Sequence, residues 1–283
     1  MKKTTAGDVI IYTLFVIIGL IMLYPFWYTL VGSLMTYNEF INTVFVIFPK
    51  KITLESYIHI FKMGSIIEPM KTTIIITIFG TILSLAMTAY TAYGLSMQFK
   101  GRNWIMAFIV FTMIVKGGLI PEFVLYKNLG LVNTRLVYII PFLINTFNLI
   151  IMRTSFMEFP VEIKESARID GCNEFGVFFR FVLPLSKPVL VTILLFYAVQ
   201  YWNTFFPSLF FVTDPEKKTL QDNLYRILAN ISDAEAAHST TSVVFSENIK
   251  MANVIITTLP ILVVYPFLQR YFIKGAMVGA IKG

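Results

Sequence analysis

The sequence is poor in cysteine, histidine and charged residues. Its single cysteine, Cys172, excludes an intrachain disulfide, and its two histidines, His59 and His238, lie too far apart to indicate a metal site. Charged residues make up 14% of the chain and apolar residues 57%, whereas a soluble domain has roughly 25% charged residues. The mean hydropathy is +0.73. A water-soluble fold would have no place for so much apolar surface, so we expect the chain to lie in a lipid bilayer.

Several motifs of catalysis are also missing. The sequence has no GxxxxGK[ST] phosphate loop, so we do not expect this chain to bind ATP itself. No Ser/His/Asp, His/Glu or Cys/His set falls at a plausible depth for a membrane-embedded enzyme. The net charge of +7 is typical of nucleic-acid binding in a soluble protein, but here the basic residues flank apolar blocks. Membrane topology explains them, and no nucleic-acid partner is expected.

Long apolar blocks dominate what is present. Each is about the length that crosses the roughly 30 Å hydrocarbon core of a bilayer. Helices are expected, because lipid leaves every backbone polar group to be satisfied within its own segment, and the alternation of barrel strands is absent. The first block is too long for a signal peptide and is interpreted as an uncleaved span. The sequence thus predicts an all-α membrane protein, one domain over 1–283, whose six transmembrane helices cover residues 9–31, 72–97, 105–125, 137–152, 189–211 and 252–272.

Basic residues indicate the orientation of these spans. The short connection around Lys100 and Arg102 and the C-terminal tail with Arg270, Lys274 and Lys282 contain no acidic residue. Such segments face the cytoplasm in most membrane proteins. We therefore expect both termini, and the polar connection 153–188, to be cytoplasmic.

Within that connection, residues 160–184 have the pattern of a short helix, a bend and a second helix. Pro160 suits the start of a helix, and Glu162 and Glu165 fall near the positive end of its dipole. Gly171 is placed where a helix can end in a left-handed cap. The second segment is apolar and aromatic until Pro184 and Pro188, where we expect it to stop.

The spacing of this connection resembles the EAA loop of bacterial ABC importer permeases. Glu165-Ser166-Ala167, then Gly171, Phe181 and Leu183-Pro184 match Glu-Ala-Ala-x3-Gly-x9-Ile-x-Leu-Pro, with Ser166 and Phe181 as departures in size. Ala167 to Gly171 (Ala-Arg-Ile-Asp-Gly) and Gln269 to Phe272 (Gln-Arg-Tyr-Phe) are similar to the carbohydrate-uptake permeases. Residues 116–121 and 128–134 are similar to the branch for complex-polysaccharide fragments.

The resemblance implies the role of the loop. In that family the loop's first helix seats in a groove of an ATPase subunit, so Glu165, Ser166, Ala167, Gly171 and Pro184 would shape the coupling element. Arg168 and Asp170 would be polar contacts, unless they only solvate a cytoplasmic face.

It also implies the partners, which are a second homologous permease, two ABC ATPase subunits that bind ATP and Mg, and an extracytoplasmic solute-binding protein. The substrate would be an oligosaccharide, the location the bacterial cytoplasmic membrane, and this chain would hold no cofactor.

Polar and aromatic residues inside spans are candidates for a substrate pathway. Tyr197, Gln200, Tyr201 and Thr204 share one helical face, Trp202 and Asn203 lie beside them, and Asn145 and Asn148 are three residues apart. Aromatic faces and amides suit a sugar. The same residues are also typical of hydrogen bonds between helices.

Lys116 is a lone cation near the outer boundary. It either extends to water or attracts an acidic sugar, and Glu122 is near enough in sequence to pair with it.

Two other transport functions are alternatives to oligosaccharide import by an ABC permease. A secondary transporter would use an ion gradient, but no Asp or Glu occurs in the middle of a span to bind the coupling proton. An ABC importer of a non-sugar solute shares the coupling loop and differs only in what it carries.

Overall fold

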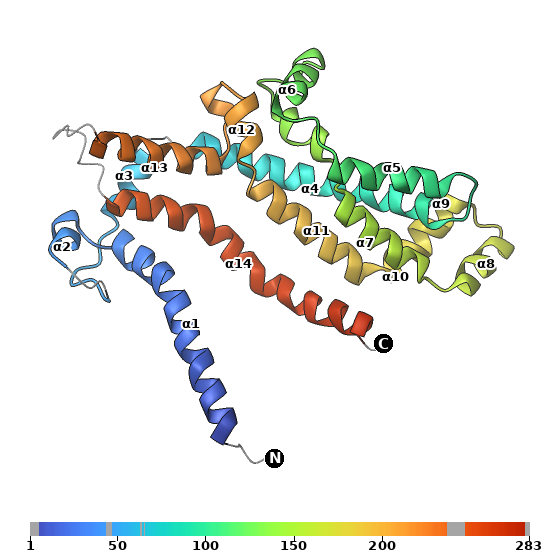
Figure 1. The fold of residues 1–283 in the computed structure, drawn as a ribbon, viewed down its shortest axis with the longest axis horizontal. Helices are drawn as coiled ribbons and strands as arrows, with labels where there is room; N and C mark the ends of the chain where they lie inside the picture. The colour runs from blue at the N-terminus through green and yellow to red at the C-terminus, as the bar shows by residue number, and fades with distance from the viewer. Residues whose placement is uncertain (1–5, 44–46, 63, 65, 237–246, 281–283) are drawn as a thin grey trace. The chain divides into compact units, whose positions relative to one another are not determined.

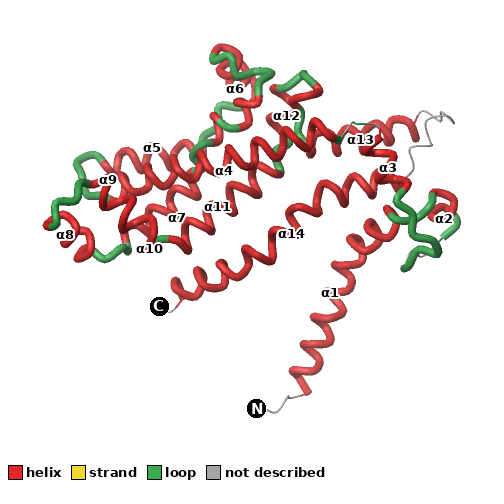
Figure 2. Tube along the Cα trace, turned by 180° about the vertical axis from the view of Figure 1, so that it is seen from behind, coloured by secondary structure: helices red, strands yellow, loops and turns green. Residues whose placement is uncertain are grey.

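The structure, a computed structural model, describes residues 6–43, 47–62, 64, 66–236 and 247–280. Helices and loops make up this described part, and it contains no strand (Figure 2). The prediction of an all-α chain is therefore confirmed. His238 lies outside the described residues. The chain divides into two compact units, which are Met1–Ile67 with Asn223–Pro260, and Glu68–Asp222 with Ile261–Gly283.

The first unit contains the N-terminal helix and the start of the C-terminal helix. The Asn248 side chain donates hydrogen bonds to the carbonyl oxygens of Gly32 (2.7 Å) and Met35 (2.9 Å). Gly32 lies in the last turn of its helix, where the carbonyl groups have no helical partners. Asn248 therefore joins the two helices. The elements of this unit are α1 (Ala6–Ser33), α2 (Tyr37–Ile41), α3 (Glu55–Lys62), most of α13 (Leu220–Ala236) and the first part of α14 (Glu247–Ala280) (Figure 1).

The second unit holds the predicted coupling loop and pathway residues. Four helices, α4, α5, α7 and α11, run lengthwise, with α8 and α9 near one end and α6 and α12 near the other (Figure 1, Figure 2). The elements are α4 (Ile67–Ser96), α5 (Arg102–Ile114), α6 (Leu119–Asn128), η1 (Arg135–Tyr138), η2 (Ile140–Phe142), α7 (Thr146–Met157), α8 (Val161–Ile169), α9 (Glu174–Val177), the π turn η3 (Phe178–Val182), α10 (Leu183–Leu185), α11 (Lys187–Trp202), α12 (Phe206–Phe211) and η4 (Pro215–Lys217).

Helix α4 contributes many buried residues to this unit. Most of them are small or hydroxylated; the buried residues are Pro69, Thr72, Thr73, Ile76, Gly80, Thr81, Ser84, Thr88, Ala89, Ala92, Tyr93 and Leu95. Small residues let helices approach closely, and hydroxyls hydrogen-bond across the interface, which are the two means of holding helices together in lipid. The remaining positions of α4 carry exposed Ile, Leu, Phe and Met side chains. The pattern explains how one apolar helix distinguishes its protein face from its lipid face.

Three helices are long and apolar enough to cross a membrane by themselves, namely Gly7–Ser33, Ile67–Ser96 and Glu247–Val264. They match the predicted spans 9–31 and 72–97 and the first part of 252–272. Three further pairs of helical segments reach this length only if each bent pair counts as one span, and their bends are 115°, 45° and 83°. The number of six spans therefore stays a prediction.

The expectation of a continuous helix over 105–125 is wrong. Helix α5 ends at Ile114, α6 begins at Leu119, and the two meet at 115°. Gly118 between them has φ +87°, which glycine adopts without strain. The ring of Pro121 would also collide with the carbonyl four residues earlier in a continuous helix.

Two other predicted spans are interrupted as well. Residues 137–152 begin with 3-10 turns, and the α-helical part starts after Asn145, because Pro141 and the capping Asn145 favour non-helical backbone. The span 189–211 divides after Trp202 into α11 and α12. Pro207 forbids continuation here, because its ring needs the space of the carbonyl at position 203.

Candidate functional site

The predicted coupling segment folds as a short exposed helix with a closed end. Helix α8 begins after Pro160, and its buried residue is Ala167, at 3% exposure. Gly171 has φ +82°. Its N–H donates to Arg168 O (3.0 Å), and the N–H of Cys172 donates to Ala167 O (2.9 Å). The left-handed cap expected at Gly171 is present, and it turns the chain toward α9.

The other predicted coupling residues lie on the surface of α8. Glu165, Ser166 and Asp170 are exposed, and none of them makes a side-chain hydrogen bond or ion pair within the described part of the chain. Arg168 is different. Its Nε donates to Oε1 of Glu174 over 2.8 Å, across the glycine bend. This side chain therefore closes the bend in addition to facing solvent.

Glu174 continues this contact into the helical bundle. Its second oxygen, Oε2, accepts a 2.8 Å hydrogen bond from the hydroxyl of Tyr93, near the C-terminal end of α4. Helix α9 begins here because Asn173 caps it, accepting from the N–H of Gly176 (2.8 Å). Arg168, Glu174 and Tyr93 thus form a hydrogen-bonded chain, named here the α8–α4 relay. Neither Glu174 nor Tyr93 was expected from the sequence.

The charges of the relay are mutually stabilised. Burial alone would raise the pKa of Glu174, but the hydrogen bonds from Arg168 and Tyr93 outweigh it and hold this pKa below its usual value. The hydrogen bond to Glu174 in turn raises the pKa of Arg168. Burial, followed by repulsion from Arg168, lowers the pKa of Lys164. The Lys164 ammonium lies 5.9 Å from the centre of the Tyr93 ring, a cation–π distance.

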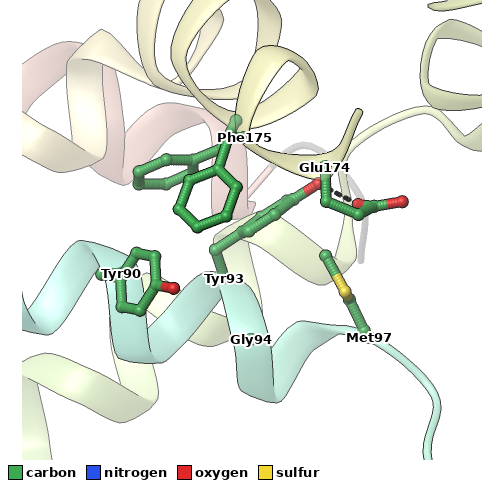
Figure 3. A pocket seen from close by; sticks show the side chains of 7 residues that line it. Tyr90, Tyr93, Gly94, Met97, Glu174 and Phe175 are labelled. Carbon is green, nitrogen blue, oxygen red and sulfur yellow. Dashed lines mark hydrogen bonds between the residues drawn. The ribbon is translucent and has the colours of Figure 1, made fainter. Parts of the chain in front are cut away.

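Aromatic side chains lie beside Tyr93 and Glu174 of the relay (Figure 3). The rings of Tyr90 and Phe175 stack at 6.1 Å, and those of Tyr93 and Phe178 pack at 4.9 Å. They border a hollow of about 220 Å³ between α4 and α9, lined by Tyr90, Tyr93, Gly94, Met97, Glu174, Phe175 and Phe178. Helix α9 and its surroundings are therefore attached to α4 by apolar contact as well as by hydrogen bonds.

The second helix of the predicted coupling loop stops between the two prolines. Pro184 itself lies within α10, and the break comes at Ser186, before Lys187 and Pro188. A π turn over Phe178–Val182 precedes the proline. Its wider hydrogen-bond ring accommodates the missing N–H and the bulky ring of Pro184, which an α-helix would not.

Two predicted pathway residues are buried within the second unit. Tyr197 and Tyr201 are 0% and 1% exposed. The Tyr197 hydroxyl hydrogen-bonds with Thr88 (2.6 Å) and accepts from the N–H of Asn145 (2.9 Å). The Tyr201 hydroxyl hydrogen-bonds with Ser84 (2.7 Å). These contacts favour hydrogen bonding between helices, and not lining of a sugar pathway, as the role of the two tyrosines.

Glycine makes room for the second of these rings. A Cβ placed on Gly80 would lie 2.7 Å from Cζ of Tyr201, closer than atoms can pack. Gly80 therefore permits the close approach of α11 to α4.

Asn145, Gln200 and Asn203 lie in less enclosed positions than the two tyrosines. Asn145 is the cap of α7 and not part of its face: its Oδ1 accepts from the N–H groups of Phe147 and Asn148. Gln200 is half-buried, and its Oε1 lies 3.5 Å from the Asn145 amide nitrogen. Asn203 is exposed, and its Oδ1 accepts from Gln221 (3.3 Å).

The other three candidates lie beyond the end of α11, at its last residue, and in the interior. Thr204 follows the end of α11, so the shared helical face does not include it; Trp202 is half-buried, and Asn148 is 3% exposed.

Lys116 lies in the break between α5 and α6 and is exposed. It forms no ion pair with Glu122 or any other carboxylate among the residues that the structure describes.

The opposite end of the second unit is held by polar contacts that the sequence did not reveal. Lys218 donates to Oδ2 of Asp222 (3.0 Å) and to Val212 O (2.9 Å), and the two charged side chains are only 10% and 0% exposed. Asn133 has φ +61°, and its Oδ1 accepts from the N–H groups of Thr213 and Asp214. Both contacts fix the chain that follows α12.

Comparison with known proteins identifies the family. Residues 84–277 match the family described as "Binding-protein-dependent transport system inner membrane component". The chain is 43% identical to "Protein LplC" of Bacillus subtilis strain 168, over 94% of this chain and 91% of that protein. It is 39% identical to the "Polygalacturonan/rhamnogalacturonan transport system permease protein YtcP" of the same organism, over 99% and 100%.

A solved structure, titled "Crystal structure of a bacterial ABC transporter involved in the import of the acidic polysaccharide alginate", contains a similar chain. It matches with a TM-score of 0.86 and 28% identity, over 96% of this chain and 100% of that one. The family match covers the coupling segment, the α8–α4 relay and most of the helical bundle. The chain belongs to the family of binding-protein-dependent transport system inner membrane components, and it is a permease subunit of an ABC importer.

Proposed function

We propose that this permease translocates an oligosaccharide that an extracytoplasmic binding protein delivers, driven by ATP hydrolysis in separate subunits. The proposed assembly contains this chain, a second homologous permease and two ATPase subunits that hold ATP and Mg. The names of the similar proteins support the sugar substrate. The observation that carries the mechanism is the α8–α4 relay, because it connects an exposed surface helix to the C-terminal end of α4.

In this proposal α8 is the element on which the ATPase acts. Glu165, Ser166 and Asp170 are exposed and available to a partner, whereas Ala167 packs against its own chain. Movement of α8 is transmitted through Arg168 and Glu174 to Tyr93, and so to α4. A ligand or partner can shift a conformational equilibrium only through differential contacts of this kind.

The sugar pathway is assigned to the less enclosed polar residues. Gln200, Asn145 and Asn203 offer amide donors and acceptors near the end of α11, and Trp202 offers a ring. Tyr197 and Tyr201 support this surface from behind, because their hydroxyls are used within the bundle. Their role is to position α11.

An acidic oligosaccharide is the favoured substrate class. Lys116 is an exposed cation without a carboxylate partner among the described residues, and it lies at the sharp α5–α6 break. The similar solved transporter imports an acidic polysaccharide. Lys116 is proposed to attract the sugar carboxylates.

The proposed topology has six spans and both termini in the cytoplasm. Thr73 and Tyr93 are 20 residues apart on α4, or about 30 Å at about 1.5 Å per residue, which equals the hydrocarbon thickness. The Thr73 end contacts Leu220 (2.8 Å), and the Tyr93 end contacts Glu174. The bilayer is therefore proposed to lie between these two ends.

Cysteine labelling tests this topology. In a Cys172→Ser background, Thr213→Cys should react with an impermeant thiol reagent in intact cells, and Glu162→Cys only after permeabilisation. Labelling of both in intact cells would contradict the orientation.

The function is tested in proteoliposomes that contain the assembled transporter and its binding protein. ATP-dependent uptake of acidic oligosaccharides is expected, and uptake that follows an ion gradient without ATP hydrolysis would instead favour a secondary transporter. Gly171→Val should abolish uptake, because a β-branched residue at φ +82° is strongly strained. Gly171→Asn is the matched control, since Asn tolerates this backbone region, and it should retain most uptake.

A further inference from the structure

Basic side chains gather where α4 ends and α5 begins. Nε of Arg153 on α7 donates a hydrogen bond to Leu95 O (2.9 Å). Nη1 of Arg102 donates to Met97 O over 3.5 Å. Both guanidinium groups therefore contact carbonyl oxygens at the C-terminal end of α4. Lys100 lies in the connection two residues before Arg102 and is exposed. Like charges at one place raise the electrostatic energy unless an anion accompanies them.

The protein itself supplies no carboxylate to this cluster. Among the described residues, neither Lys100 nor Arg102 nor Arg153 forms an ion pair with Asp or Glu. The carbonyl oxygens that accept from the two arginines are neutral groups at the end of α4 and carry only partial negative charge. The cluster therefore retains a net positive charge that a bound anion would balance.

A polar hollow lies beside the cluster. Its volume is about 470 Å³, and it is lined by Gln98, Phe99, Gly101, Arg102, Asn103 and Trp104. Gly101 has φ +91°, which turns the chain sharply from α4 into α5. Amides and a guanidinium around an open hollow are donors suited to a phosphate group.

An exposed apolar stripe continues from this hollow along α5. Trp104, Phe108 and Phe111 are 83%, 67% and 56% exposed, and their spacing of four and three residues places them on one face. Tryptophan is typical of the membrane–water interface, and the Phe side chains that follow lie deeper. Headgroup chemistry and acyl-chain chemistry are thus adjacent on the same element.

We propose that the α4–α5 connection binds an anionic phospholipid, with its phosphate in the hollow beside Arg102 and an acyl chain along Trp104, Phe108 and Phe111. The inference rests on the proposed function only for the placement of this helix end at the membrane surface. The site lies at the same end of α4 as Tyr93 and the relay. Lipid composition would therefore affect the end of α4 on which coupling depends.

Quenching of Trp104 fluorescence tests the site without sugar or ATP, so its result is independent of the transport function. The assembled transporter, with Trp27→Phe and Trp202→Phe, is reconstituted in phosphatidylcholine vesicles that contain brominated phosphatidylglycerol or brominated phosphatidylcholine. Brominated phosphatidylglycerol should quench Trp104 at a lower mole fraction than brominated phosphatidylcholine does. The mole fraction needed should fall about fivefold for each cation involved. Equal quenching by the two lipids would overturn the proposal.

Charge variants make the test specific. Arg102→Gln and Lys100→Gln should each lower the preference for phosphatidylglycerol about fivefold, whereas Arg102→Lys should retain it. Arg180→Gln removes an exposed cation of the π turn and should leave the preference unchanged.

Three results would contradict the lipid assignment. The first is a preference unaffected by Arg102→Gln. The second is its loss on addition of inorganic phosphate, which would indicate a site for free phosphate. The third is dissociation of the ATPase subunits from Arg102→Gln with lipid preference intact, which would assign the cluster to a protein interface.

Discussion

The hydroxyl of Tyr93 on α4 donates a 2.8 Å hydrogen bond to Oε2 of Glu174, while Oε1 of the same carboxylate accepts from Arg168 on α8. One carboxylate therefore connects the surface helix and the bundle. Because both of its oxygens are used, Glu174 cannot change one contact without affecting the other.

Tyr93→Phe should uncouple α8 from α4 while leaving the Arg168–Glu174 pair. We expect the attachment to weaken by about 1 kcal/mol, because hydrogen bonds to charged groups contribute more than neutral ones but Glu174 is partly exposed. The transporter should still assemble, and less sugar should enter per ATP hydrolysed. Tyr90→Phe is the matched control, since the Tyr90 hydroxyl makes no hydrogen bond within the described part of the chain. Equal effects of both variants would contradict a role for the relay.

The relay also predicts a dependence on pH. The folded-state pKa of Glu174 is lowered, so its contribution to stability is present above the unfolded pKa of about 4.3 and is lost as pH falls through the folded value. The difference in melting temperature between wild type and Glu174→Gln should be constant near neutral pH and shrink in acid. The effect should be small, because both charged side chains are 46% exposed. If this difference in melting temperature grew in acid, the effect would have the opposite sign, and ionisation of Glu174 would be excluded as its cause.

Gly80→Ala should destabilise the bundle. Its new methyl group would meet the Tyr201 ring at 2.7 Å, and overpacking of this kind typically costs about 1–3 kcal/mol. Gly94→Ala on the same helix meets nothing within 4 Å and should be neutral or stabilising. Melting temperatures in detergent measure the difference. Similar values for the two variants would show that α11 can move away from α4.

Gln200→Ala and Tyr201→Phe should separate transport from packing. Loss of the Tyr201–Ser84 hydrogen bond should cost about 0.6 kcal/mol, and at most about 1.7, with unchanged uptake per folded complex. Gln200→Ala should leave stability nearly unchanged but lower uptake or alter the preferred sugar. Uptake and melting temperature are measured for both. The reverse pattern would move the sugar pathway to Tyr201.

The buried Lys218–Asp222 pair should contribute more to stability than the exposed Lys217–Asp214 pair. Lys218→Met leaves a buried carboxylate uncompensated and should cost about 3–5 kcal/mol. Lys217→Met removes a pair whose side chains are 37% and 30% exposed and should cost less than about 1 kcal/mol. Lys218→Met combined with Asp222→Leu should recover stability, because no buried charge remains. If the double variant were as unstable as the single one, packing and not charge would dominate there.

Local features were predictable from the sequence, whereas long-range partners were not. The bend at Gly171 was predictable because a glycine follows directly on a short helical pattern. The positive φ of Gly171 agrees with that prediction. The partner of Glu174, Tyr93, is 81 residues away, and no local pattern identifies it. Tyr197 and Tyr201 were correctly placed on one helical face. Which neighbour that face contacts is decided by packing against Ser84 and Thr88.

The broken helices were a different kind of error. Apolar content alone was used to define the spans, and it carries no information about backbone geometry. Pro121, Pro141 and Pro207 each mark a place where an α-helix cannot continue unchanged, and each lies within a predicted span. Proline alone does not predict such breaks, however, because α1 and α14 continue past Pro25 and Pro260.

The contact of Asn248 with the end of α1 determines an order of events during biosynthesis. The carbonyls of Gly32 and Met35 leave the ribosome 216 and 213 residues before their donor. At about 5–20 residues per second, the first helix waits on the order of 10 to 40 s for Asn248. In the apolar 18-residue window of α1 no side chain is buried, so the protein holds little of this helix in the meantime. Lipid must therefore retain α1 alone until nearly the whole chain has been made, and the first unit can close only as synthesis ends.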